Sequence, residues 1–112
     1  MLDCWYEGCG SCFKEFPLFQ KLYIDNNGYS DIRFYASGVT YNDTVNLFEV
    51  VERRNINLPM FTIERNDATE LEITVYPTVI IIDDCSRIVF RGDLRDSELF
   101  LKNILRISFC QR

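Results

Sequence analysis

Two cysteines, Cys9 and Cys12, are separated by two residues in the stretch CWYEGCGSCFKEFP, and this spacing can support redox chemistry. A helix that begins at Cys9 places Cys12 one turn later on the same face, within the Cα separation that a disulfide bond allows. Unpaired backbone N–H groups and the helix dipole would stabilise a thiolate on Cys9. The spacing therefore predicts a reactive pair in which Cys9 is the nucleophile and Cys12 is the resolving thiol.

Two other interpretations of the pair stay open at this point. Zinc would need four ligands, and the chain has neither a second short cysteine spacing nor a histidine. The pair could also be two small core residues, because cysteine is often a buried, unreactive side chain. A CxxC pair at a turn from a strand into a helix favours the redox interpretation.

The composition limits the class of protein. The chain has 112 residues, of which 47% are hydrophobic, and this is enough for one domain with its own core. The formal net charge of -5 and the absence of a basic run argue against a nucleic-acid partner. The longest apolar run, 79–82, is far too short to span a bilayer, and the first residues lack the pattern of a signal peptide.

The elements that must position the pair follow from periodicity and from turn residues. A buried strand over 1–6 precedes the pair, and the helix that starts at Cys9 is expected to kink at Pro17 and to end near Asn26. The order of strands and helices in the first half favours parallel strands with a right-handed crossover. The other predicted elements are a strand over 31–37, a helix over 44–56 capped by Asn42 or Asp43, an extended segment over 60–64, a helical turn over 67–71, a β-hairpin that turns at 84–87, and a final helix capped by Ser97.

These features resemble the thioredoxin superfamily, and in particular its TlpA/ResA-type thiol-disulfide oxidoreductases. The resemblance covers nearly the whole chain. It implies an α/β protein with a thioredoxin-like three-layer α/β/α fold and a central mixed sheet of four to five strands, lacking the usual N-terminal strand or strands. The residues that carry it are Trp5, Cys9-Gly10-Ser11-Cys12, Glu15 and Pro17 in a CxxCxxExP pattern, Tyr76-Pro77-Thr78, and Gly92.

The resemblance also implies roles for residues outside the pair. Asp3, six residues before Cys9, corresponds to a buried acid that moves the proton of the resolving cysteine, although so near the chain start it could equally be a solvated, inert carboxylate. Pro77 is implied to be a cis-proline facing the pair, and Tyr76 to offer backbone groups to an extended substrate peptide. The implied substrate-binding residues are Trp5, Gly10, Ser11, Tyr76 and Pro77.

By this resemblance the chain is an enzyme, a protein disulfide oxidoreductase that reduces or exchanges protein disulfides without a cofactor or a metal. Its partners would be protein disulfides or dithiols and a thiol-disulfide electron donor. Its location would be extracytoplasmic, on the periplasmic side, with the cytoplasm as the alternative. A different class of function is a redox-inert binding module with the thioredoxin fold and a permanent Cys9–Cys12 disulfide. Tyr6 disfavours a peroxidase, because peroxiredoxins have Thr or Ser at that position, and the lack of histidine disfavours copper delivery.

The chain departs from the family pattern in several places. Gly8 stands where a second tryptophan is common, and Ser11 where proline is common. Because the chain begins inside the strand that leads to the pair, we expect residues 1–112 to be a single domain from a longer chain. The edge of the 31–37 strand would then be uncovered. The other cysteines are expected to be a core residue, an exposed thiol, and a residue on or just past the last helix: Cys4, Cys85 and Cys110, respectively.

Overall fold

The computed structural model describes residues 1–26 and 32–104 of the chain. Its strands form one mixed five-stranded sheet in the order β3-β2-β1-β4-β5. The central strand β1 is parallel to β2 and antiparallel to β4, while β3 continues the parallel half and β5 the antiparallel half. The strands are β1 (Leu2–Trp5), β2 (Tyr35–Thr40), β3 (Met60–Glu64), β4 (Thr78–Ile82) and β5 (Ile88–Gly92).

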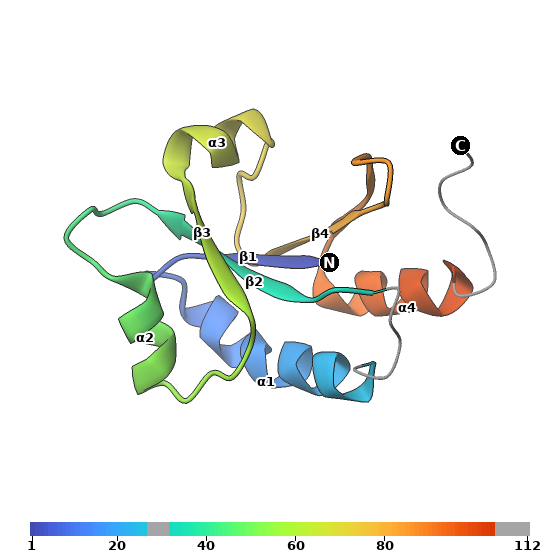
Figure 1. The fold of residues 1–112 in the computed structure, drawn as a ribbon, viewed down its shortest axis with the longest axis horizontal. Coiled ribbons are helices and arrows are strands. Elements are labelled where there is room, and N and C mark those ends of the chain that lie inside the picture. Colours follow the sequence, from blue (N-terminus) through green and yellow to red (C-terminus); the bar gives the residue numbers. More distant parts are fainter. Residues whose placement is uncertain (27–31, 105–112) are drawn as a thin grey trace.

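Helices cover both faces of this sheet. Figure 1 shows α1, α2 and α4 on one side and α3 on the other. The thioredoxin-like three-layer α/β/α arrangement with a mixed sheet is therefore confirmed. The helices are α1 (Gly10–Asp25), α2 (Leu47–Arg53), α3 (Arg65–Glu70) and α4 (Leu94–Ile104).

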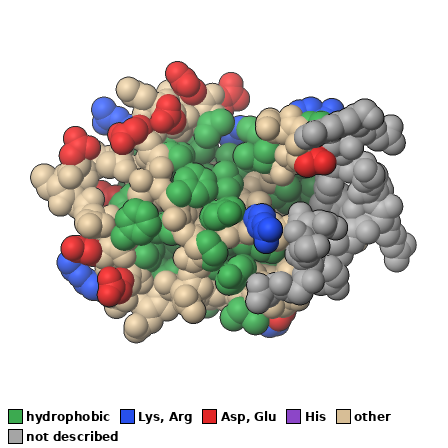
Figure 2. Space-filling model, in the orientation of Figure 1, with side chains coloured by type: hydrophobic (Ala, Val, Ile, Leu, Met, Phe, Trp, Pro, Cys, Tyr) green, Lys and Arg blue, Asp and Glu red, His purple; other side chains and the backbone are tan. Residues whose placement is uncertain are grey.

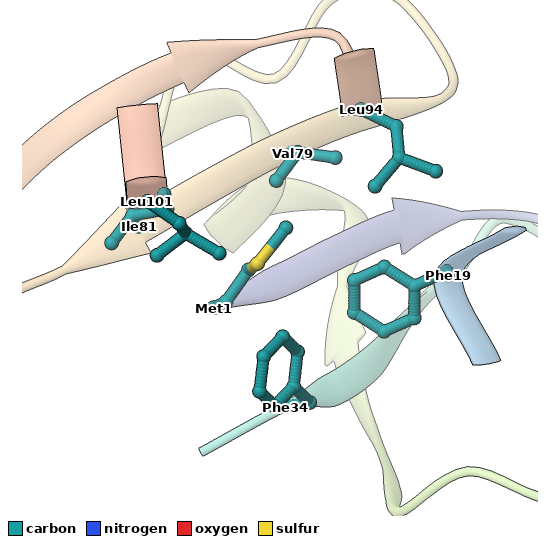
Figure 3. Close-up of a cluster of buried hydrophobic side chains, with 7 residues drawn as sticks. All are labelled: Met1, Phe19, Phe34, Val79, Ile81, Leu94 and Leu101. Atoms are coloured by element: carbon teal, nitrogen blue, oxygen red, sulfur yellow. The ribbon is translucent and has the colours of Figure 1, made fainter. Parts of the chain in front are cut away.

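The alternation of side chains along β1 divides the core between the two faces. Met1 and Trp5 pack on the face covered by α1, whereas Cys4 packs on the other face with Ala68 of α3. Figure 3 shows the part of the core that joins α1 and α4 to the sheet. Its buried side chains are Met1, Phe19, Phe34, Val79, Ile81, Leu94 and Leu101. Because Asp3 lies between Met1 and Trp5 on the strand, it shares the α1 face.

The helix α1 begins where the sequence predicts, since Cys9 is its N-cap, and it continues through Pro17 to Asp25. Two other helix starts differ from the prediction. Asn46 caps α2 by accepting hydrogen bonds from the amides of Phe48 and Glu49, while Asn42 accepts from Thr44 in the preceding turn. The final helix starts earlier than expected.

At the start of α4, Asp93 accepts a hydrogen bond from the amide of Asp96 at 2.8 Å. Ser97 lies one turn inside the helix, fully buried, and its hydroxyl donates to the carbonyl of Leu94 at 2.6 Å. Ser97 is thus a buried helix residue and Asp93 has the capping role. The sequence pattern could not separate them, because both residue types are frequent caps.

The strand β2 corrects two expectations. It spans Tyr35–Thr40, later than the predicted 31–37, because its register with β1 pairs Leu2 with Tyr35 and Trp5 with Gly38. Its other edge is not open, since β3 pairs with it in parallel from Ala36 to Thr40. The segment 60–64 thus forms the predicted extended element and also satisfies the backbone groups that would otherwise be exposed.

The surface combines apolar and acidic areas. Figure 2 shows hydrophobic side chains over the middle of one face, with acidic side chains along its upper and left margins. No helix among residues 1–26 and 32–104 is long and apolar enough to cross a membrane.

Candidate active site

The two cysteines of the CxxC motif form a disulfide bond at the start of α1, with their Cα atoms 5.3 Å apart. Cys9 is 5% exposed and Cys12 is 1% exposed, so Cys9 is the more accessible of the two sulfurs. Both lie in a buried cluster that also contains Trp5 and Phe16. Only a short turn separates the end of β1 from the start of α1, so the pair lies at the carboxyl end of the central strand of the sheet.

The backbone at the helix start is oriented towards the sulfur of Cys9. The amide of Cys12 donates a hydrogen bond to Cys9 Sγ at 3.1 Å, and Ser11 Oγ lies 3.5 Å from the same sulfur. When the disulfide is reduced, the same amide and the helix dipole would stabilise negative charge on Cys9 rather than on Cys12. The site therefore has a chemically distinct first cysteine.

The segment before β4 forms a second wall beside the pair. The Tyr76–Pro77 peptide bond is cis, and the side chain of Tyr76 packs against the cluster that contains both cysteines. Thr78 follows with its hydroxyl donating to the carbonyl of Val75 at 2.6 Å. Burial, and a hydrogen bond with Tyr41, raise the pKa of the Tyr76 phenol. Tyr76 and Pro77 are both half-buried, so a part of each is available to a ligand.

Asp3 is a buried carboxyl group on the α1 face of the sheet, 1% exposed. Neither of its carboxylate oxygens has a hydrogen-bond partner among the described residues. Burial, and then the nearby carboxylate of Glu15, raise the pKa of Asp3 well above its ordinary value. The structure thus places Asp3 in the protein interior and not in the solvated position that its nearness to the chain start also allowed.

Glu15, which the sequence indicated as a solvated or tuning residue rather than a catalytic one, lies near the buried Asp3. It is half-buried, its Oε1 atom has no partner among the described residues, and burial followed by the charge of Asp93 raises its pKa. A groove of about 460 Å³ between α1 and α4 is lined partly by Glu15 and Asp93, and it contains neither cysteine. Glu15 thus borders this groove, and its carboxylate is near enough to Asp3 to raise the pKa of that buried group.

Trp5 does not have the place that the resemblance implied for it. It was expected to contact substrate, but it is 0% exposed and lies beneath α1, with ring centroids 5.8 Å from Phe13 and 5.5 Å from Phe16. Trp5 supports the helix that carries the cysteines. Gly10 and Ser11, in contrast, are exposed beside Cys9, so they are accessible to a bound molecule.

Cys4 and Cys85 do not belong to the buried cluster that contains the pair. Cys4 is a fully buried free thiol on the α3 face, as expected for a core residue, and burial raises its pKa to about 12. Cys85 is half-buried and disulfide-bonded, which corrects the expectation of an exposed thiol. Cys110 lies outside the described residues. Among the residues that the structure describes, no group of three or more His, Cys, Asp or Glu side chains is placed to hold a metal ion.

Comparison with known proteins places this geometry in a structural class. No protein-family model and no curated protein matches the chain. Its fold is similar to that of a candidate thiol-disulfide oxidoreductase from Bacteroides vulgatus, with a TM-score of 0.71 and 22% identity over 92% of this chain and 71% of that one. It is also similar to StoA from Bacillus subtilis, with a TM-score of 0.70 and 20% identity over 88% of this chain and 76% of that one.

A third solved structure is a candidate thiol:disulfide interchange protein DsbE from Chlorobium tepidum. It has a TM-score of 0.73 and 17% identity over 93% of this chain and 75% of that one. The chain therefore has the thioredoxin-like fold that its sequence predicted. At these identities the similarity establishes the fold, and the activity has to be argued from the site itself.

Proposed function

We propose that this protein is a TlpA/ResA-type thiol-disulfide oxidoreductase that reduces or exchanges protein disulfides through Cys9 and Cys12. The observation that carries the proposal is the bonded cysteine pair at the N-terminus of α1, with the Cys12 amide donating to Cys9 Sγ at 3.1 Å. This arrangement favours a thiolate on Cys9. It also lets Cys12 attack Cys9 Sγ and re-form the disulfide. Two structurally similar proteins, one named a thiol-disulfide oxidoreductase and the other a thiol:disulfide interchange protein, support the same chemistry.

The reaction balances with the two thiols as the electron source. In the reduced protein the Cys9 thiolate attacks a substrate disulfide, forms a mixed disulfide, and releases one substrate thiolate. Cys12 then loses its proton and attacks Cys9 Sγ, which releases the second substrate thiolate and leaves the Cys9–Cys12 disulfide. A thiol electron donor reverses these two steps on the protein. The substrate is reduced by two electrons and the cysteine pair is oxidised by two.

The other residues have supporting roles in this proposal. Asp3 accepts the proton of Cys12, with Glu15 linking the buried carboxyl to the groove beside α4. An extended peptide pairs with the backbone of Tyr76 beside Pro77, while Gly10 and Ser11 leave its approach to Cys9 open. The family resemblance supports a location outside the cytoplasm and a thiol-disulfide electron donor as a partner.

One observation favours a second candidate function. Both sulfurs are almost completely buried in the oxidised form, as expected for a permanent disulfide in a redox-inert binding module. A redox titration against glutathione distinguishes the two candidates. We expect the pair to open and close reversibly with a midpoint above about -300 mV, because structural disulfides lie below that value. Thiol counting by mass spectrometry measures the reduced fraction.

The titration needs an activity assay beside it, because a reducible pair is not yet an enzyme. The reduced protein should reduce a protein disulfide faster than an equal concentration of dithiol donor alone. A midpoint below about -300 mV, with no reductase activity, would instead establish the binding module.

The buried Asp3 gives a further prediction on stability. Its raised pKa means that the folded protein binds this proton more tightly than the unfolded chain. Stability is therefore greatest below the ordinary carboxyl pKa and decreases as the pH rises towards the raised pKa. An Asp3→Asn variant should match the native protein at about pH 4 and be more stable by about 1–3 kcal/mol at about pH 8. Urea unfolding at both pH values measures the difference.

Two controls separate charge from packing in this experiment. Asp43→Asn removes a carboxylate from an exposed position and should give no pH-dependent gain. If Asp3→Asn stabilised the protein equally at both pH values, the cost at Asp3 would not come from its charge. In the reductase assay, Asp3→Asn should slow the resolving step by at least roughly tenfold, because the proton acceptor is lost.

A further inference from the structure

Three tyrosine side chains from separate parts of the chain meet beside the disulfide. Tyr6 lies in the turn between β1 and α1, Tyr41 follows β2, and Tyr76 precedes the cis-proline. The ring centroids are 5.3 Å apart for Tyr6 and Tyr41, 4.9 Å for Tyr6 and Tyr76, and 6.1 Å for Tyr41 and Tyr76. All three pairs meet edge to face, so the rings form one compact group, which we call the tyrosine triad.

The tyrosine triad is held in a fixed position relative to the cysteines. The carbonyl of Tyr6 accepts a hydrogen bond from the amide of Cys9 at 3.1 Å. Tyr6 and Tyr76 pack against the buried cluster that contains Cys9 and Cys12. Tyr41 joins them through its hydroxyl, which lies 2.8 Å from that of Tyr76. Movement of the triad would therefore disturb the site.

Gly8 makes room for this arrangement. A Cβ atom at Gly8 would lie 2.8 Å from Cε2 of the Tyr6 ring, closer than real Cβ contacts allow. The ring of Tyr6 therefore lies over the turn that leads to Cys9, in space that a larger residue at position 8 would take. The glycine that departs from the family pattern and the tyrosine next to it are thus parts of one local structure.

The chemistry of the triad indicates the kind of side chain that it would bind. Tyr41 is 42% exposed, and Tyr6 and Tyr76 are half-buried. Because the hydroxyls of Tyr41 and Tyr76 bond to each other, the surface left for a ligand is mainly that of the rings. Fixed aromatic rings bind apolar side chains with little loss of conformational entropy, which is why tyrosine is frequent at the centres of interfaces.

We propose that the tyrosine triad binds an aromatic or large aliphatic side chain within two residues of the cysteine of an extended peptide substrate. The proposal rests on the proposed function for its reactive step, but binding of the peptide can be measured without that step. Tyr76 connects the proposed peptide-binding backbone with the triad, because its backbone borders Pro77 and its ring belongs to the triad. Tyr6 and Tyr41 would then determine which disulfides the protein prefers.

The test begins with binding to the oxidised protein, since this readout needs no redox activity. The probes are unreactive extended peptides in which serine replaces the cysteine. In each peptide, one of the four positions within two residues of that serine carries Phe, Leu, Lys or Ser. Calorimetry should show that a Phe or Leu peptide binds at least roughly fivefold more tightly than the Ser peptide. Equal affinity across the series, or a preference for Lys, would overturn the proposal.

Variants then assign the preference to the triad. Tyr41→Ala should reduce the preference for Phe over Ser by roughly 5- to 30-fold, whereas Tyr41→Phe keeps a ring and should retain most of it. Tyr35→Ala is the matched control, because Tyr35 is similarly exposed at 36% but contacts Phe61 at the opposite end of β2. Loss of the preference in Tyr35→Ala, or its full retention in Tyr41→Ala, would contradict the assignment.

A kinetic measurement distinguishes failure of this inference from failure of the proposed function. Reduction of bis(2-hydroxyethyl) disulfide, which has no side chain for the triad, supplies a reference rate for each protein, and the peptide rates below are compared after division by this reference rate. Reduction of a Phe-containing peptide disulfide should be slower in the variant by the same 5- to 30-fold factor as binding. Selective binding without reduction of either disulfide would support the triad and reject the oxidoreductase.

Discussion

Replacement of Cys9 by serine should abolish disulfide reductase activity, with a decrease of roughly 10³-fold or more. A serine hydroxyl is a poor nucleophile near neutral pH, and the variant cannot form a mixed disulfide with the substrate. The position of Cys9 makes the effect specific, since its sulfur accepts a hydrogen bond from the amide of Cys12 and Cys9 is the more exposed of the two cysteines. The measurement is reduction of a protein disulfide by a dithiol donor, with the variant at the same concentration as the native protein.

The Cys12→Ser variant should fail at a different step. Cys9 can still attack the substrate, but no thiol remains to attack Cys9 Sγ, so a mixed disulfide with the substrate should accumulate in a single turnover. Mass spectrometry under non-reducing conditions detects this adduct. The reverse result, an adduct on Cys12 in a Cys9→Ser variant with normal rates, would exchange the two roles.

Cys4→Ala is the matched control for loss of a thiol. Cys4 is fully buried, and its raised pKa of about 12 makes it a poor nucleophile. The variant should keep reductase activity close to that of the native protein once the assay is corrected for the folded fraction. Retained activity in Cys9→Ser together with lost activity in Cys4→Ala would reject the proposed mechanism.

The parts of the fold that the sequence predicted well depend on local signals. The CxxC spacing, the strand before it and the helix after it lie in one continuous stretch, so periodicity and capping rules apply directly. The extended segment that forms β3 was also predicted at its observed bounds. Its place in the sheet was not predicted, because pairing of β3 with β2 depends on register between distant residues and not on composition.

The site was harder to predict where its residues come together from separate segments. Tyr6, Tyr41 and Tyr76 are far apart in the chain, and no periodic pattern links them. Helix starts were ambiguous for a related reason. Asn42 and Asn46 are both good caps, and the choice falls on Asn46 because Leu47 and Val51 can then be buried on the α1 side of the sheet.

The burial of Trp5 shows how tertiary packing changes the interpretation of a motif residue. Position five carries part of the resemblance to thioredoxin-like oxidoreductases, and such a residue is naturally expected to touch substrate. In the structure Gly38 lies directly against the ring. A Cβ atom at this position would lie 3.2 Å from Cζ2 of Trp5, so the sheet leaves just enough space for the indole. The buried indole thus supports α1 on the sheet and has no exposed surface for a substrate.

Truncation of this tryptophan should have the largest effect on stability. In Trp5→Ala a fully buried ring is lost, together with its edge-to-face contacts with Phe13 and Phe16, and the free energy of unfolding should decrease by about 3–5 kcal/mol. That is a large share of the total for a domain of this size, which is about 5–15 kcal/mol. Urea unfolding of the oxidised protein measures the change, and it is monitored by far-ultraviolet circular dichroism, because the variant has lost its only tryptophan.

Trp5→Phe separates the packing role of this side chain from a role in substrate binding. Phenylalanine keeps much of the ring contact and removes the indole Nε1, which has no hydrogen-bond partner among the described residues, so the variant should lose only about 1–2 kcal/mol. Because Trp5 has no exposed surface, Trp5→Phe should bind peptides as tightly as the native protein does. Weaker peptide binding by a variant of unchanged stability would mean that α1 moves aside and exposes Trp5 to the substrate.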